Sequence, residues 1–110
     1  MNLDGLHDAI VTSISLEVDA KTITLSLKPI QFEGAPDHVS LVAHDWKRFS
    51  CPKEEPWGHA ATWQVNQTRG PFEVTSGLLR LDLEMQSGDV IEIHASLFER
   101  HDGRVAAIAG

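Results

Sequence analysis

The chain has 110 residues, a length that suits one hydrophobic core, and we predict a single β domain over residues 1–110. Nine Lys and Arg against sixteen Asp and Glu give a net charge of −7, which repels phosphate groups and argues against a nucleic-acid partner. The N-terminus, MNLDGLHDAI, carries acids where a signal peptide carries bases, and no apolar run is long enough to span a bilayer. We therefore expect a cytoplasmic protein without a membrane partner.

The first part of the chain alternates apolar and polar residues in short blocks, a pattern that is typical of β-strands. Residues 10–18 and 22–28 predict a hairpin with a short turn between its strands. Residues 31–37 contain Gly and Pro and predict a loop, after which residues 39–43 predict a third strand.

The alternation stops in residues 50–61, SCPKEEPWGHAA, where two prolines and a charged run predict a loop or an edge segment. Trp57 lies between Pro and Gly in this segment, and two interpretations stay open: the indole packs over the core, or it contacts a partner. Residues 63–65 then give a weak strand signal, 66–71 predict a turn, and 72–74 predict a short edge strand.

Residues 78–98 give the clearest signal, because two alternating runs flank a turn at 87–89 and predict a β-hairpin. Its odd-numbered apolar residues are expected to face the core and its even-numbered neighbours the solvent. A turn at 100–103 and a last strand at 105–108 complete the chain. Together these elements predict an all-β fold, either an antiparallel β-sandwich or a partly closed barrel of about six to eight short strands.

The polar side of this hairpin gathers acidic residues. Asp82 and Glu84 lie on one strand, and Glu92 and His94 face them from the other. Like charges opposite each other destabilise a sheet, so this face is a candidate contact for a basic partner protein. The alternative is an ordinary solvated face whose acids are compensated by Arg80.

Sequence spacing favours neither a metal site nor a catalytic site. The six histidines lack the short fixed spacing of metal ligands, so we expect no metal and no cofactor. Cys51 is the only cysteine and cannot form an internal disulfide; Lys47 and Lys53 are expected to lower its pKa modestly, but no neighbour completes a catalytic dyad.

Three segments, Leu6-His7-Asp8-Ala9, Glu55-Pro56-Trp57-Gly58 and Leu83-Glu84-Met85-Gln86-Ser87-Gly88-Asp89, resemble small bacterial all-β proteins related to the immunity protein fifty family. The resemblance covers most of the chain and implies protection of a cell from a toxin. It brings no catalytic residues. The sequence has His59-Ala60-Ala61 where the family is expected to have a small Ser or Pro-Ser segment.

The sequence thus favours a non-enzymatic, protein-binding domain of the immunity type, with Trp57, Asp82, Glu84 and Glu92 as binding residues for a basic, toxin-like partner. Two other classes stay open. One is a small-ligand-binding protein or enzyme with a pocket formed by the Trp57 loop, His59 and His7, and the other is a structural subunit of a larger bacterial assembly.

Overall fold

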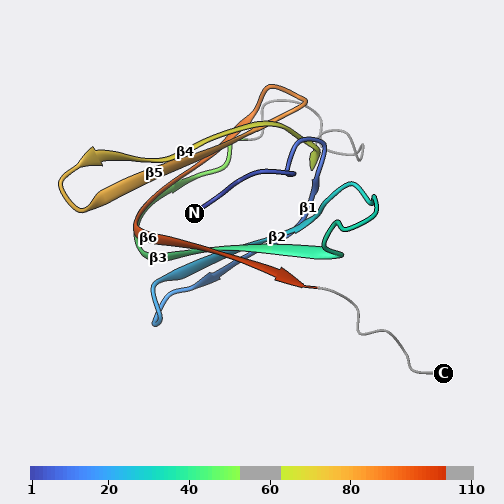
Figure 1. Cartoon of the computed structure of the whole chain (residues 1–110). Helices are drawn as coiled ribbons and strands as arrows, with labels where there is room; N and C mark the ends of the chain where they lie inside the picture. Colours follow the sequence, from blue (N-terminus) through green and yellow to red (C-terminus); the bar gives the residue numbers. More distant parts are fainter. Residues whose placement is uncertain (53–62, 104–110) are drawn as a thin grey trace.

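A computed structural model describes residues 1–52 and 63–103, which form one antiparallel sheet (Figure 1). The strand order is β1-β2-β3-β6-β5-β4. The strands are β1 (Ile10–Glu17), β2 (Thr22–Lys28), β3 (His38–Ser50), β4 (Val65–Thr75), β5 (Leu78–Met85) and β6 (Val90–Gly103). The predicted all-β antiparallel fold is therefore confirmed, with six strands in the described residues.

The single sheet bends so that β4 and β5 lie over β2 and β3, while β6 runs from one layer into the other, but the sheet does not close into a barrel (Figure 1). Its edge strands, β1 and β4, approach each other at one end. There an isolated bridge joins Ile10 to Gln64, the Asp8 amide donates to the Val65 carbonyl at 2.7 Å, and the Val65 amide donates to the Ala9 carbonyl at 2.8 Å. The bent sheet therefore forms two facing layers that remain open on one side.

The bend lies where the alternation of inward-facing and outward-facing side chains is interrupted in both β3 and β6. In β6, Phe98 and Ala95 are buried although they are three residues apart, and Leu97 between them is 50 % exposed. On β3, Asp45 takes a left-handed backbone conformation with φ of 53°, and its amide donates to the Lys21 carbonyl at 2.9 Å. The predicted burial of Leu97 is therefore wrong, because the strict two-residue period fails at the bend.

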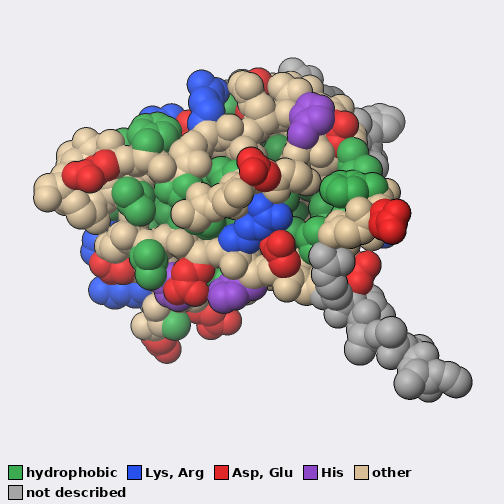
Figure 2. Space-filling view, viewed as in Figure 1, with side chains coloured by type: hydrophobic (Ala, Val, Ile, Leu, Met, Phe, Trp, Pro, Cys, Tyr) green, Lys and Arg blue, Asp and Glu red, His purple; other side chains and the backbone are tan. Residues whose placement is uncertain are grey.

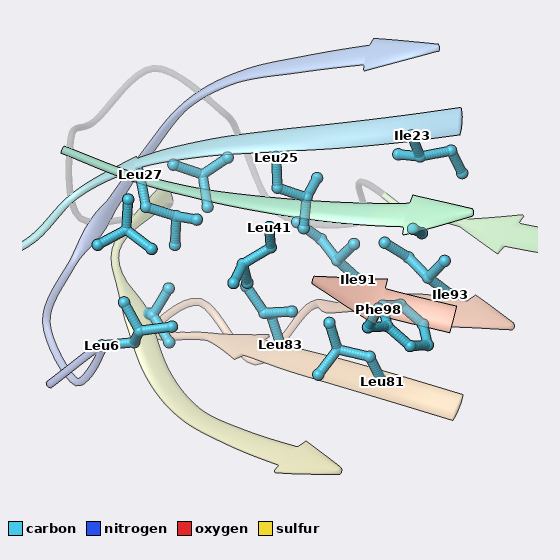
Figure 3. Close-up of a cluster of buried hydrophobic side chains, with 14 of the residues drawn as sticks. Leu6, Ile23, Leu25, Leu27, Leu41, Leu81, Leu83, Ile91, Ile93 and Phe98 are labelled. Carbon is cyan, nitrogen blue, oxygen red and sulfur yellow. The ribbon is translucent and has the colours of Figure 1, made fainter. Parts of the chain in front are cut away.

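The core fills the space between the two layers, where leucine and isoleucine side chains from β2 and β3 point toward those of β5 and β6 (Figure 3). The predicted burial of the apolar residues in the β5–β6 hairpin is confirmed for Leu81, Leu83, Met85, Ile91, Ile93 and Ala95. Leu6, from the segment that precedes β1, is also fully buried. The guanidinium of Arg100 holds this segment by donating to the carbonyls of Asn2 at 3.1 Å and Asp4 at 2.7 Å.

Two predicted turns belong to strands instead. Residues 66–71 lie within β4, because Gly70, with φ of 98° and a cis bond to Pro71, is accommodated by a register shift between Arg69 and Phe72. Residues 100–103 continue β6, which pairs with β3 as far as His38 and Gly103. The predicted strand at 105–108 lies outside the described residues.

Asp45 at the bend also has a perturbed carboxyl group. Hydrogen bonds from Ser96 at 3.0 Å and Lys47 at 3.2 Å lower its pKa, with the Ser96 bond as the larger cause. A lowered folded-state pKa stabilises the protein above the unfolded pKa, and this contribution is lost as the pH falls through the folded-state value.

We expect Ser96→Ala to raise the pKa of Asp45 toward its ordinary value, because the carboxylate then loses its main donor. An NMR titration of the Asp45 carboxyl carbon measures this shift. Ser15→Ala, at an exposed residue of β1, serves as the control and should leave the titration unchanged. An unchanged Asp45 pKa in Ser96→Ala would contradict the assignment.

Candidate functional site

The outer side of the β5–β6 hairpin brings three of the four predicted binding residues together. Asp82 lies directly opposite Glu92 in the strand register, and Glu84, two residues further along β5, lies on the same side of the sheet. The fourth, Trp57, lies outside the described residues.

Arg80 bridges the two opposed carboxylates. Its Nε and Nη2 donate to Asp82 at 2.9 and 3.1 Å, and its Nη2 also lies 3.0 Å from Glu92. The Asp82 hydrogen bond raises the pKa of Arg80. The side chain of Asp82 is only 5 % exposed, so this carboxylate holds the guanidinium and is not itself a contact surface. The prediction that all even-numbered neighbours face solvent is therefore wrong at Asp82, because the ion pair draws it into the sheet surface.

Strands β3 and β4 supply further charged groups to the same side. Arg48 lies 3.5 Å from Glu92, and Arg69 lies 3.8 Å from Glu84, which also accepts a hydrogen bond from Gln67. His94 Nε2 lies 2.7 Å from Glu92. We name this surface the hairpin face, and it comprises Arg48, Arg69, Phe72, Arg80, Asp82, Glu84, Glu92 and His94.

The hairpin face is charge-balanced and not acidic, because its three carboxylates are matched by three guanidinium groups. The prediction of an acidic patch is therefore wrong. The alternative, a face whose acids are compensated by arginine, describes the charges better. Arg48 and Arg69 were missed from the sequence, because only the strand order places β3 and β4 on either side of the hairpin.

Phe72 adds an aromatic group to this face. It lies opposite Arg80 in the β4–β5 register, and the Arg80 Cζ lies 5.9 Å from the centre of its ring, a cation–π arrangement. The ring is 44 % exposed. The alternation of Phe72 with polar neighbours gave a strand signal, but the sequence alone did not place it beside Arg80.

Of the alternative pocket, the structure describes only His7. His7 is 69 % exposed; its Nδ1 lies 2.5 Å from the carbonyl of Asn66, and its Nε2 lies 3.5 Å from Asp8. The other two residues of this pocket, Trp57 and His59, lie outside the described part of the chain.

No metal-binding group of three or more His, Cys, Asp or Glu is found within residues 1–52 and 63–103. The pKa of the Cys51 thiol is raised, first by burial and second by the charge of Asp89. The predicted lowering by nearby lysines is therefore wrong, since burial and the charge of Asp89 both disfavour the thiolate, which is the nucleophilic form.

Comparison with known proteins identifies no relative of this chain. No protein-family model, curated protein or solved structure matches this chain. The resemblance to the immunity protein fifty family stays a prediction. In the part of the chain that the structure describes, no helix has the length and apolar character needed to cross a membrane. The function is therefore inferred from the residues of the hairpin face and from the charge of the chain.

Proposed function

We propose that this chain is a non-enzymatic protein-binding domain, an immunity-type inhibitor, that contacts a basic partner protein through its hairpin face. One observation carries the proposal: an exposed aromatic ring, Phe72, lies beside an arginine, Arg80, whose position is fixed by two carboxylates. Aromatic residues and arginine are the side chains that contribute most often to binding energy at protein interfaces.

The ion pairs of this face reduce the cost of binding. A free arginine loses rotamer entropy when a partner immobilises it, whereas Arg80 is already held by Asp82 and Glu92. On either side of it, Arg48 and Arg69 have side chains that are 67 % and 59 % exposed. Glu84 and Glu92, with side chains 24 % and 21 % exposed, offer carboxylate oxygens to a basic partner.

Long-range attraction of the partner comes from the rest of the chain. Since the hairpin face carries three negative and three positive groups, the net charge of −7 resides on the other residues. Acidic side chains are spread over the side of the molecule seen in Figure 2 and do not form one patch. A diffuse negative field speeds the arrival of a basic protein, while the hairpin face sets how long it stays bound.

The resemblance to immunity proteins, which are encoded beside toxin genes, implies that the partner is the product of the gene immediately upstream. Binding kinetics with that product test this proposal. We expect Phe72→Ala to speed dissociation about tenfold, because it removes an aromatic anchor. Phe32→Ala is the matched control, since Phe32 is 64 % exposed but lies in the loop between β2 and β3. Added salt should slow association in all variants.

Two results would contradict the proposal. One is equal dissociation rates for the Phe72 and Phe32 variants, and the other is the absence of any complex with the upstream product. Circular dichroism of each variant shows whether it has kept the fold.

A further inference from the structure

The two edges of the open sheet differ in regularity. Edge strand β4 has three register shifts against β5, between Val65 and Gln67, Arg69 and Phe72, and Glu73 and Thr75. Such irregularities keep an edge from pairing with another chain. Edge strand β1 has one shift, near Val11, and then pairs regularly with β2 from Ser13 to Glu17. Residues 13–17 contain no Pro and, apart from Glu17 at the end of the strand, no charged residue that would protect this edge.

Apolar side chains are exposed along the unprotected edge. Leu16 is 44 % exposed and Val18, which follows β1 directly, is 76 % exposed. At the other end of the strand, residues 10–14 and Trp63 line a groove of about 460 Å³. The edge therefore offers an apolar side chain at one end and an apolar groove at the other.

We propose that β1 pairs in antiparallel fashion with β1 of a second copy of this chain, about a two-fold axis at Ser15. In this register Ile14 lies opposite the second copy's Leu16, and both belong to the inner side of the sheet, since their β2 partners Leu25 and Ile23 are buried. Such an interface uses the same surface on both copies and closes after two.

The register avoids unfavourable charge contacts between the two copies. It pairs Ser13 with the second copy's Glu17, so no two acids lie directly opposite each other. The Glu17 side chains of the two copies are four positions apart, about 13 Å at strand spacing, which exceeds the screening length of about 8 Å at physiological salt. The paired stretch ends at Ser13, beside the register shift near Val11, and at Glu17, just before the turn that contains Val18.

This pairing is independent of the proposed function, because the hairpin face lies on β3 to β6 and not on β1. A contact made by one strand from each copy is small, so we expect a weak dimer that forms more readily as salt screens the charge of −7 on each chain. Sedimentation of the full chain at rising concentration should show a mass that increases from 12.1 kDa toward twice that value.

Cysteine cross-linking tests the register. In a Cys51→Ser background, Ser15→Cys should oxidise to a covalent dimer, because facing residues of antiparallel strands have Cα atoms about 4.5–5.5 Å apart, within disulfide range. Ser13→Cys alone is the control and should give about tenfold less covalent dimer, since the two Ser13 positions lie about 13 Å apart in this register. A mixture of Ser13→Cys and Glu17→Cys chains should cross-link to each other.

Substitution of the edge gives the second measurement. Leu16→Lys should abolish the dimer in sedimentation, whereas Ile30→Lys, at a residue 48 % exposed in the β2–β3 loop, should leave it intact. A chain that stays at 12.1 kDa at every concentration and salt would overturn the proposal. Equal cross-linking of Ser15→Cys and Ser13→Cys would also overturn it, and would indicate random collision.

Discussion

Replacing Leu81 or Ile93 with Ala is expected to lower the free energy of unfolding by about 2–5 kcal/mol, the range for truncating a large core side chain. The two residues lie directly opposite each other in the β5–β6 register and are 0 % and 1 % exposed. Each truncation removes apolar burial and leaves a cavity between the two layers of the sheet, which the flanking strands fill only in part.

Chemical denaturation followed by circular dichroism measures this loss. Ile30→Ala is a suitable control, because Ile30 is 48 % exposed and its truncation should change the free energy of unfolding by about 0.5 kcal/mol or less. Because Leu81 and Ile93 share one site in the core, the double variant is not expected to show additive effects. Unchanged denaturation midpoints in both single variants would mean that the inward side of the hairpin is assigned wrongly.

The second large effect is expected at Asp82, whose replacement with Ala should cost about 1–3 kcal/mol. The variant removes two hydrogen bonds to Arg80 and leaves that guanidinium, whose side chain is 34 % exposed, with Glu92 as its remaining carboxylate partner within the described residues. Glu84→Ala should cost less than about 1 kcal/mol, since its partner Arg69 is 59 % exposed and 3.8 Å away.

The comparison of these two acids is informative because the sequence alone makes them equivalent. Both alternate with leucines on the polar side of β5, yet only Asp82 is buried by its ion pair. Equal destabilisation by Asp82→Ala and Glu84→Ala would contradict the role given to Arg80. A reversal of Asp82 to Lys would place a cation against Arg80 and disturb the fold, so Glu84→Lys is the better variant for testing how charge affects partner binding.

Much of the sheet could be predicted from local alternation. The hairpin from β5 to β6 and the first hairpin, β1 to β2, follow from a period of two and from turn residues between the runs. The bend could not be predicted, because local alternation shows neither the left-handed backbone of Asp45 nor the β3–β6 register shift between Trp46 and Arg48, nor the change of alternation near Leu97. Gly70-Pro71 predicts a turn because Gly and Pro are common turn residues. Only the pairing with β5 shows that it forms a bulge inside β4.

The candidate site was predictable within one hairpin and no further. Asp82 and Glu92 face each other as the sequence indicated, since both lie on adjacent runs of one motif. Arg48 and Arg69 come from strands that are distant in sequence, and they change the charge of the face from acidic to balanced. Such contributions follow from strand order, which local patterns do not specify.

Chemical-shift mapping of the ¹⁵N-labelled chain, titrated with the upstream gene product, tests the protein-binding proposal most directly. The hairpin face predicts that the largest changes fall on β4, β5 and β6, with Phe72, Arg80 and Glu92 among them. If the changes instead fall on β1 and β2, or if the spectrum does not change at all, the hairpin face is not the contact surface.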